Sequence, residues 1–116
     1  MIVGLYFKSI FGNMWARVEN NTCEEIKDIE IILKDVPMGT SKIKKVLGKS
    51  KERIAINKRG MRKAGYLMVK FNDLQGNSYK RDFDEVILPD DYKDVSIEIS
   101  KVNNEYVMNL KPGIND

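Results

Sequence analysis

Apolar and polar residues alternate one by one through several short segments of this chain, and that period of two constrains the fold more than any other feature. Three such segments cover residues 29–33, 66–72 and 95–99. Successive side chains of a β-strand point to opposite faces of a sheet, so each segment predicts a strand with one buried face. The expected core residues in these segments are Ile29, Ile31, Leu33, Leu67, Val69, Phe71, Val95, Ile97 and Ile99.

Turn-forming residues follow two of these segments and predict how the strands are connected. Residues 73–77 predict a turn that leads into a returning strand over residues 78–88. The pair Asn103-Asn104 predicts a tighter turn, after which residues 106–110 return beside residues 95–100. Both arrangements are antiparallel hairpins.

One segment, residues 40–48, departs from the alternation and predicts a short helix. Thr40 or Ser41 can cap its first turn, and Gly48 is placed to stop it. Its apolar residues follow the helical spacing i, i+3, i+4, namely Ile43, Val46 and Leu47. A strand over residues 53–57 and a basic loop over residues 58–65 follow. We therefore expect a basic helix-and-loop insertion at about residues 40–65.

These elements predict a single all-β domain, or a mainly β domain with one short helix, over residues 1–116. A chain of this length can bury its own core. Roughly six to eight hairpin-connected strands predict a small antiparallel β-barrel or β-sandwich. By architectural analogy, an immunoglobulin-like sandwich and a small RNA-binding barrel of the PUA or OB kind both fit the pattern, and strand periodicity does not separate them.

The residue types present exclude several kinds of catalysis. The chain has no histidine and one cysteine, Cys23, which excludes Ser-His-Asp and Cys-His catalysis, a disulfide within the chain and cysteine-rich zinc sites. A metal-dependent hydrolase built on Asp82 or Asp90 would need two carboxylates and a lysine in one set, and the spacing indicates none. We expect a non-enzymatic protein without a metal or cofactor.

The first eleven residues are apolar, but they lack a basic leader and a small-residue cleavage site, and Lys8 interrupts them. No stretch approaches the roughly 18 apolar residues of a membrane span. We therefore expect a cytoplasmic protein that does not engage a membrane, and we take the glycosylation sequon at Asn20 as chance. The abundance of Lys, Ile and Asn indicates an AT-rich coding sequence, as in a low-GC bacterium or one of its mobile elements.

The sharpest functional signal is a segregation of charge. Residues 42–63, called the basic segment below, carry ten basic residues and one acid, a net charge of +9, whereas the rest of the chain carries −6. Clustered Lys and Arg residues neutralise phosphates. Alternatively, the segment is a solvated loop or pairs with the acidic residues 82–94. Its basic residues are Lys42, Lys44, Lys45, Lys49, Lys51, Arg53, Lys58, Arg59, Arg62 and Lys63.

A second signal comes from an expected first hairpin, in which Gly12-Asn13 joins residues 2–11 to residues 14–18. An aromatic ring flanked by cations on an open sheet face can stack unpaired bases, at about 1–3 kcal/mol per base. The same side chains would be core if another element covered them. The face directed away from the core is expected to carry Tyr6, Lys8, Ile10, Trp15 and Arg17.

Together these signals predict a nucleic-acid-binding regulatory protein, with RNA or another single-stranded nucleic acid favoured over duplex DNA. The expected binding residues are Lys8, Trp15, Arg17 and the ten basic residues of the basic segment. The alternative is a protein–protein interaction module, either an adaptor or an inhibitor of a nucleic-acid-handling enzyme, that uses the same basic surface to meet an acidic protein.

Overall fold

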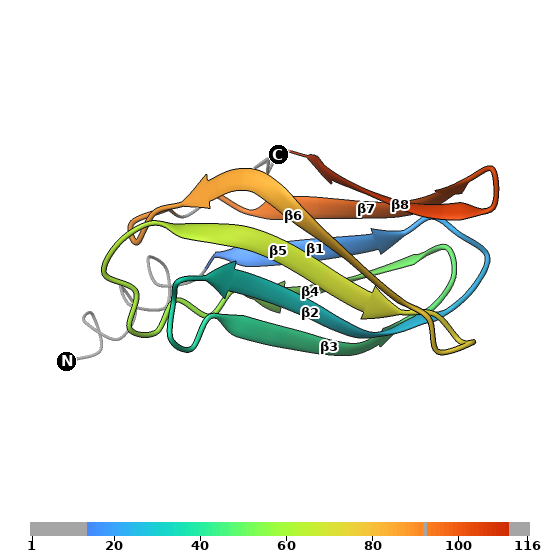
Figure 1. The fold of residues 1–116 in the computed structure, drawn as a ribbon, viewed down its shortest axis with the longest axis horizontal. Helices are drawn as coiled ribbons and strands as arrows, with labels where there is room; N and C mark the ends of the chain where they lie inside the picture. Colours follow the sequence, from blue (N-terminus) through green and yellow to red (C-terminus); the bar gives the residue numbers. More distant parts are fainter. Residues whose placement is uncertain (1–13, 92, 112–116) are drawn as a thin grey trace, which may run out of the picture.

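The computed structural model describes residues 14–91 and 93–111, which form eight β-strands (Figure 1). The strands are β1 (Trp15–Asn20), β2 (Ile26–Lys34), β3 (Thr40–Val46), β4 (Ser50–Ala55), β5 (Gly65–Asn72), β6 (Ser78–Ile87), β7 (Val95–Val102) and β8 (Glu105–Lys111). These described residues form no helix, and hence none that could cross a membrane. The prediction of an all-β fold is confirmed.

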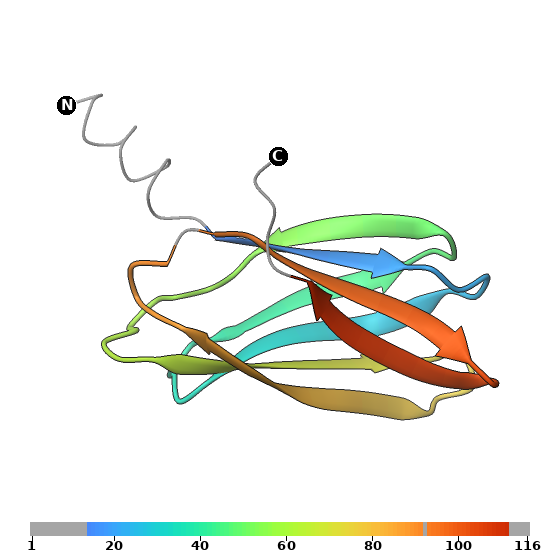
Figure 2. The same cartoon turned by 90° about the horizontal axis from the view of Figure 1, so that it is seen from above.

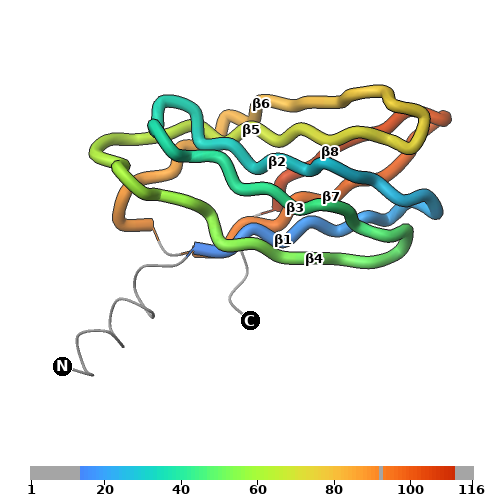
Figure 3. The backbone as a smooth tube through the Cα atoms, turned by 90° about the horizontal axis from the view of Figure 1, so that it is seen from below, coloured from blue at the N-terminus to red at the C-terminus, as the bar shows by residue number. Residues whose placement is uncertain are grey.

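The strands form two four-stranded sheets that pack face to face (Figures 2 and 3). The first sheet has the order β4-β1-β7-β8, and the second has the order β3-β2-β5-β6. Strand pairs are antiparallel except for β1 and β7, which are parallel. The fold is therefore a sandwich.

The core lies between the two sheets and is built from residues that alternate along the strands. On β5, Leu67, Val69 and Phe71 are at most 1% exposed, whereas Met68 and Lys70 between them are only partly buried. Inner faces of two aligned sheets interdigitate in this way to fill a sandwich core. All nine core residues expected from the alternation are buried, so that prediction is confirmed.

The two hairpins expected from turn residues are both present, as β5–β6 and β7–β8. In the first turn, Asp73 Oδ1 accepts hydrogen bonds from the backbone N–H groups of Gln75 (3.0 Å) and Asn77 (2.9 Å). In the second, Asn103 and Asn104 have φ angles of 52° and 67°. Two consecutive left-handed residues characterise the tight type I′ turn, which asparagine tolerates better than most residues.

The predicted helix over residues 40–48 is wrong, because most of these residues form β3. In the pairing with β2, Ile43 lies opposite Ile29, and Val46 lies opposite Ile26. A helix this short is unstable on its own, because the free energy gained from the hydrogen bonds of one or two turns is smaller than the cost of nucleation. As a strand, β3 forms hydrogen bonds with β2 along its length. Gly48 serves the following turn, where an added Cβ would lie 2.6 Å from the backbone of Cys23.

Residues 40–65 are consequently not an insertion but part of the framework of both sheets. β3 is an edge strand of the second sheet, and β4 is an edge strand of the first. Residues 47–49 carry the chain from one sheet to the other, and residues 56–64 form the loop to β5. The strand expected over residues 53–57 corresponds to β4, which begins and ends earlier.

The predicted first hairpin falls largely outside the described residues, including its expected face residues Tyr6, Lys8 and Ile10. Its described half, β1, pairs with β4 on one side and with β7 on the other. The segment expected to pair with β1, residues 2–11, lies outside the described residues. The assignment of faces is confirmed, because Ala16 and Val18 are buried while Trp15 and Arg17 lie on the outer face.

Candidate nucleic-acid interface

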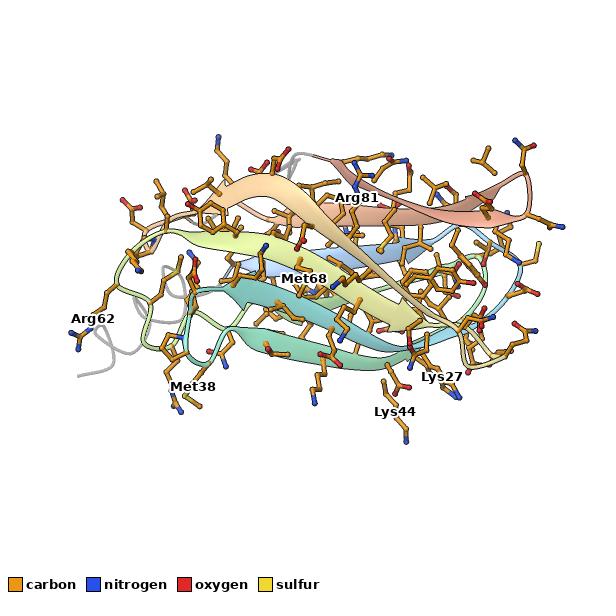
Figure 4. All side chains as sticks on the ribbon, viewed as in Figure 1. Lys27, Met38, Lys44, Arg62, Met68 and Arg81 are labelled. Carbon is orange, nitrogen blue, oxygen red and sulfur yellow. The ribbon has the colours of Figure 1, made fainter. Side chains whose placement is uncertain are left out.

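The basic segment lies along one side of the sandwich and around one end. Figure 4 shows Lys44 projecting from β3 and Arg62 projecting from the β4–β5 loop, in different directions. The segment is therefore an extended surface rather than one compact patch. Its residues come from β3 (Lys42, Lys44 and Lys45), the β3–β4 turn (Lys49), β4 (Lys51 and Arg53) and the β4–β5 loop (Lys58, Arg59, Arg62 and Lys63).

Most of these basic side chains have no carboxylate partner in the part of the chain that the structure describes. Setting Lys58 aside, the ion pairs found there are Lys34–Asp82 (3.1 Å), Lys101–Glu24 (2.5 Å) and Lys111–Glu98 (2.7 Å). None of them involves the basic segment. Internal neutralisation by the acidic residues 82–94 is therefore not the general role of this segment.

Lys58 is the exception, because it holds two loops together. Its ammonium group donates hydrogen bonds to the backbone carbonyls of Leu88 (3.2 Å), Pro89 (3.4 Å) and Asp91. Burial lowers the pKa of Lys58, and the carboxylates of Asp91 and Asp90 act in the opposite direction. Since these contacts tie the β4–β5 loop to the β6–β7 loop, we leave Lys58 out of the candidate interface.

Two groups that the sequence presents separately meet on the outer face of the first sheet. Trp15 and Arg17 belong to β1, and Arg53 belongs to the neighbouring strand β4. The guanidinium carbon of Arg53 lies 4.4 Å from the centre of the Trp15 ring, which is a cation–π contact. Arg17 lies directly opposite Arg53 in the strand register. We call these three residues the Trp15 patch.

The backbone geometry brings the two arginines of the patch close together. The backbone N–H of Ile56 donates to the carbonyl of Met14 at 2.7 Å, so Met14 and Ile56 form a hydrogen-bonded pair. Hydrogen-bonded and non-hydrogen-bonded pairs alternate along antiparallel strands. Arg17 and Arg53, three positions further, are therefore a non-hydrogen-bonded pair, with Cα atoms about 4.5 Å apart. Like charges at this separation destabilise a sheet.

Acidic residues on the same face are engaged with other partners. Glu19 accepts a hydrogen bond from Ser96 Oγ at 3.2 Å. Glu98 pairs with Lys111 at 2.7 Å, and the hydrogen bond from Lys111 lowers the pKa of Glu98. Neither arginine of the Trp15 patch forms an ion pair with another described residue. The Asp94 carboxylate also lies beside the patch, where its Oδ1 accepts a hydrogen bond from the backbone N–H of Trp15 at 3.1 Å.

A buried asparagine holds the β3–β4 turn, and with it the basic side of the sandwich, against β1. Asn20 is 0% exposed, and its Nδ2 donates to the carbonyls of Glu24 (2.7 Å), Val46 (3.2 Å) and Leu47 (3.2 Å). Its Oδ1 accepts from the backbone N–H and the hydroxyl of Thr22, at 3.0 and 2.7 Å. Because this side chain is buried and fully bonded, the sequon at Asn20 is inaccessible to glycosylation in the folded protein.

The acidic residues considered for metal chemistry do not gather into a site. Nowhere in the described ranges do three side chains of the metal-binding types lie together in a way that could hold an ion. Asp82 instead reaches Lys34 at 3.1 Å, and both side chains are about half exposed. An exposed ion pair of this kind stabilises a fold by at most about 1 kcal/mol.

An aromatic cluster near the end of β1 was not anticipated from the sequence. Phe71 stacks on Tyr79 with ring centres 5.1 Å apart, and the Tyr106 ring lies 5.2 Å from the first and 4.8 Å from the second. Burial, followed by the hydrogen bond to Glu24, raises the pKa of Tyr106 to about 12, so its hydroxyl stays protonated. The β5–β6 register pairs Phe71 with Tyr79, but Tyr106 comes from the other sheet, which no local pattern indicates.

Comparison with known proteins shows a likeness of fold. A solved structure described as the NMR structure of the protein from Eubacterium rectale matches with a TM-score of 0.62 and 15% sequence identity. The match covers 90% of this chain and 93% of that chain. No protein-family model matches the sequence, and no curated protein does.

Proposed function

We propose that this protein binds single-stranded nucleic acid, without catalysing a reaction, and that the Trp15 patch is the centre of its binding surface. The observation that carries this proposal is the direct opposition of Arg17 and Arg53, neither with an ion-pair partner among the described residues. A phosphate between the two guanidinium groups would replace their repulsion with bidentate, charge-assisted hydrogen bonds.

Trp15 extends the proposed site from phosphate to base. Its ring is half-buried on the outer face of the sheet, with the Arg53 guanidinium group beside it. Single-stranded RNA and DNA are commonly held by stacking of their bases on aromatic rings and guanidinium planes. Bases inside a duplex are already stacked and paired, so the arrangement favours single strands. RNA is the ligand we favour.

Lysines of β4 and β3 extend the positive surface beyond the patch. Lys51 lies two residues from Arg53 and therefore on the same face of β4. Lys42, Lys44 and Lys45 follow on β3, the adjacent edge of the second sheet. Lysines on edge strands also discourage association through strand addition. The two roles are compatible, because neither requires the ammonium groups to be neutralised within the protein.

Trp15 is the sole tryptophan, so intrinsic fluorescence reports directly on the proposed site. We expect single-stranded oligonucleotides of about ten residues to change its emission on binding. With three phosphate contacts and a slope of about −0.7 per contact, the affinity should fall about 20-fold between roughly 50 and 200 mM salt. Duplex DNA should bind more weakly than either single strand at equal salt.

Charge reversal separates this site from general electrostatic attraction. Arg53→Glu should weaken binding of labelled single-stranded RNA at least about tenfold in fluorescence anisotropy, and Trp15→Ala should weaken it about fivefold or more through lost stacking. The matched control is Lys80→Glu, which makes the same change in charge on β6 at the opposite edge. An equal effect of both reversals, or no binding to any single strand, would rule out the proposal.

The second candidate function is docking onto an acidic protein surface. Two exposed apolar side chains flank β3 and favour it, since Met38 and Leu47 are each 52% exposed and protein interfaces have a partly apolar centre. Leu47→Ser should then weaken binding to an acidic protein partner and leave nucleic-acid affinity unchanged. Binding of a poly-glutamate peptide as tightly as RNA of equal charge would favour this candidate over the first.

A further inference from the structure

A cleft opens between β3 and β4 beside the Trp15 patch. Its volume of about 630 Å³ lies within the range of small-molecule binding sites. Its walls include Thr40 and Ser41 from β3, Ile54 and Ala55 from β4, and Asn57 and Arg59 from the following loop. Apolar side chains, two hydroxyl groups, an amide group and a guanidinium group therefore line one space.

The cleft forms because the chain leaves one sheet for the other at this point. Ile56 still bonds to Met14 in the first sheet, at 2.7 Å. The next residue, Asn57, donates its backbone N–H to Ser41 Oγ of the second sheet at 3.0 Å. Ser41 is 7% exposed, so its hydroxyl is part of a fixed wall and not a mobile surface group.

Ala55 connects the cleft to the Trp15 patch. It lies directly opposite Trp15 in the β1–β4 register and hence on the same outer face. Ala55, like Arg53, occupies a non-hydrogen-bonded position relative to β1, so its backbone N–H and C=O point toward the free edge of β4. Backbone groups at such an edge can bond to the polar edge of a base, as base-specific RNA contacts require.

Taking the proposed function as its premise, we propose that this cleft is a pocket for one unpaired nucleobase of the bound strand. The base would enter between β3 and β4 and lie against the side chains that line the cleft. The adjoining phosphate would then lie over Ala55, toward the pair Arg17 and Arg53. A paired base cannot enter without leaving its helix, so the pocket provides a second reason for selecting single strands.

Two strands of equal length and charge test the pocket separately from phosphate binding. One is an ordinary oligonucleotide of about ten residues, and the other carries abasic sites throughout. Thr40→Tyr places a ring at the cleft wall from an exposed position on an edge strand, where tyrosine is well accommodated. This substitution should lower the affinity for the ordinary oligonucleotide about tenfold. The affinity for the abasic oligonucleotide should stay within about twofold of the wild-type value. Thr40→Val, which adds no bulk, should alter neither affinity.

The outcomes distinguish the pocket from the proposed function. If Thr40→Tyr does not change the affinity for the ordinary oligonucleotide, or lowers the affinity for both oligonucleotides equally, the base pocket is wrong. Binding that depends on Arg53 would still support the proposed function. If the wild-type protein binds neither strand, both inferences are wrong. A urea unfolding midpoint of Thr40→Tyr equal to that of the wild type guards against a misfolded variant.

Discussion

Removal of the Asn20 side chain tests how the basic side of the sandwich is held in place. Asn20→Ala removes five hydrogen-bond contacts, in which the two N–H groups of Nδ2 are shared among three carbonyls and Oδ1 accepts two hydrogen bonds. The side chain is 0% exposed, so water cannot readily replace it. Buried polar groups that lose their partners cost more than the net value of the hydrogen bonds they had formed.

The magnitude follows from these contacts. Four protons take part in these contacts, so at about 1 kcal/mol per hydrogen bond the simple sum is about 4 kcal/mol. The sum is too high, because the Glu24 carbonyl and the Thr22 hydroxyl still bond to each other, at 3.0 Å. We therefore expect Asn20→Ala to lower the free energy of unfolding by about 3 kcal/mol, out of the roughly 5–15 kcal/mol typical of a small domain.

Urea unfolding followed by Trp15 fluorescence measures this loss. The control is Asn109→Ala, an exposed site on β8 whose contact with Arg81 is 3.5 Å long, and it should change stability by less than about 0.5 kcal/mol. The amide of Lys49, which donates to the Thr22 carbonyl at 2.9 Å, should exchange faster in Asn20→Ala. A loss below about 1 kcal/mol would refute the reasoning, since strand pairing alone would then hold the turn.

Two further predictions concern the hairpin turns. Burial opposes ionisation of Asp73, but hydrogen bonds from Asn77, Tyr79 and Gln75 outweigh it and lower the pKa of this carboxyl group. Because the pKa of Asp73 is lower in the folded state than in the unfolded state, its ionised carboxylate stabilises the fold above about pH 4. This stabilisation is lost as the pH falls further. Asp73→Asn should therefore reduce the fall in urea midpoint between about pH 5 and 3, and an identical fall in both proteins would contradict this. Asn104→Gly should raise stability by about 0.5 kcal/mol, because glycine adopts the φ of 67° without strain. An unchanged or lower melting temperature would contradict that.

Strands and their turns were accessible to prediction wherever the signal was local. The alternation over residues 66–72 identified β5, because side-chain direction in a strand follows directly from the backbone. Asn103-Asn104 identified the β7–β8 turn, because these residues tolerate the backbone angles that the turn requires. The outward direction of Trp15 and Arg17 was predicted for the same reason, although the strand expected to pair with them lies outside the described residues.

β3 shows where local patterns mislead. Ile43, Val46 and Leu47 have helical spacing, and a run of nine residues is too short for spacing alone to decide. The outcome was set by β2, which supplies hydrogen bonds and apolar partners along the whole of β3. Those partners lie in a different part of the sequence, so the competition between helix and strand could not be judged from residues 40–48.

The amino-acid pattern alone determined the fold class, the inward and outward faces of most strands and the presence of a strongly basic segment. Tertiary structure alone decided that Arg53 lies against Trp15 and opposite Arg17, because this contact requires β4 to pair with β1. It also decided that β7 joins β1 in parallel, across about 80 residues of intervening chain. Side-chain direction is a property of the local backbone, whereas strand partners are selected by the burial of apolar surface over the whole chain.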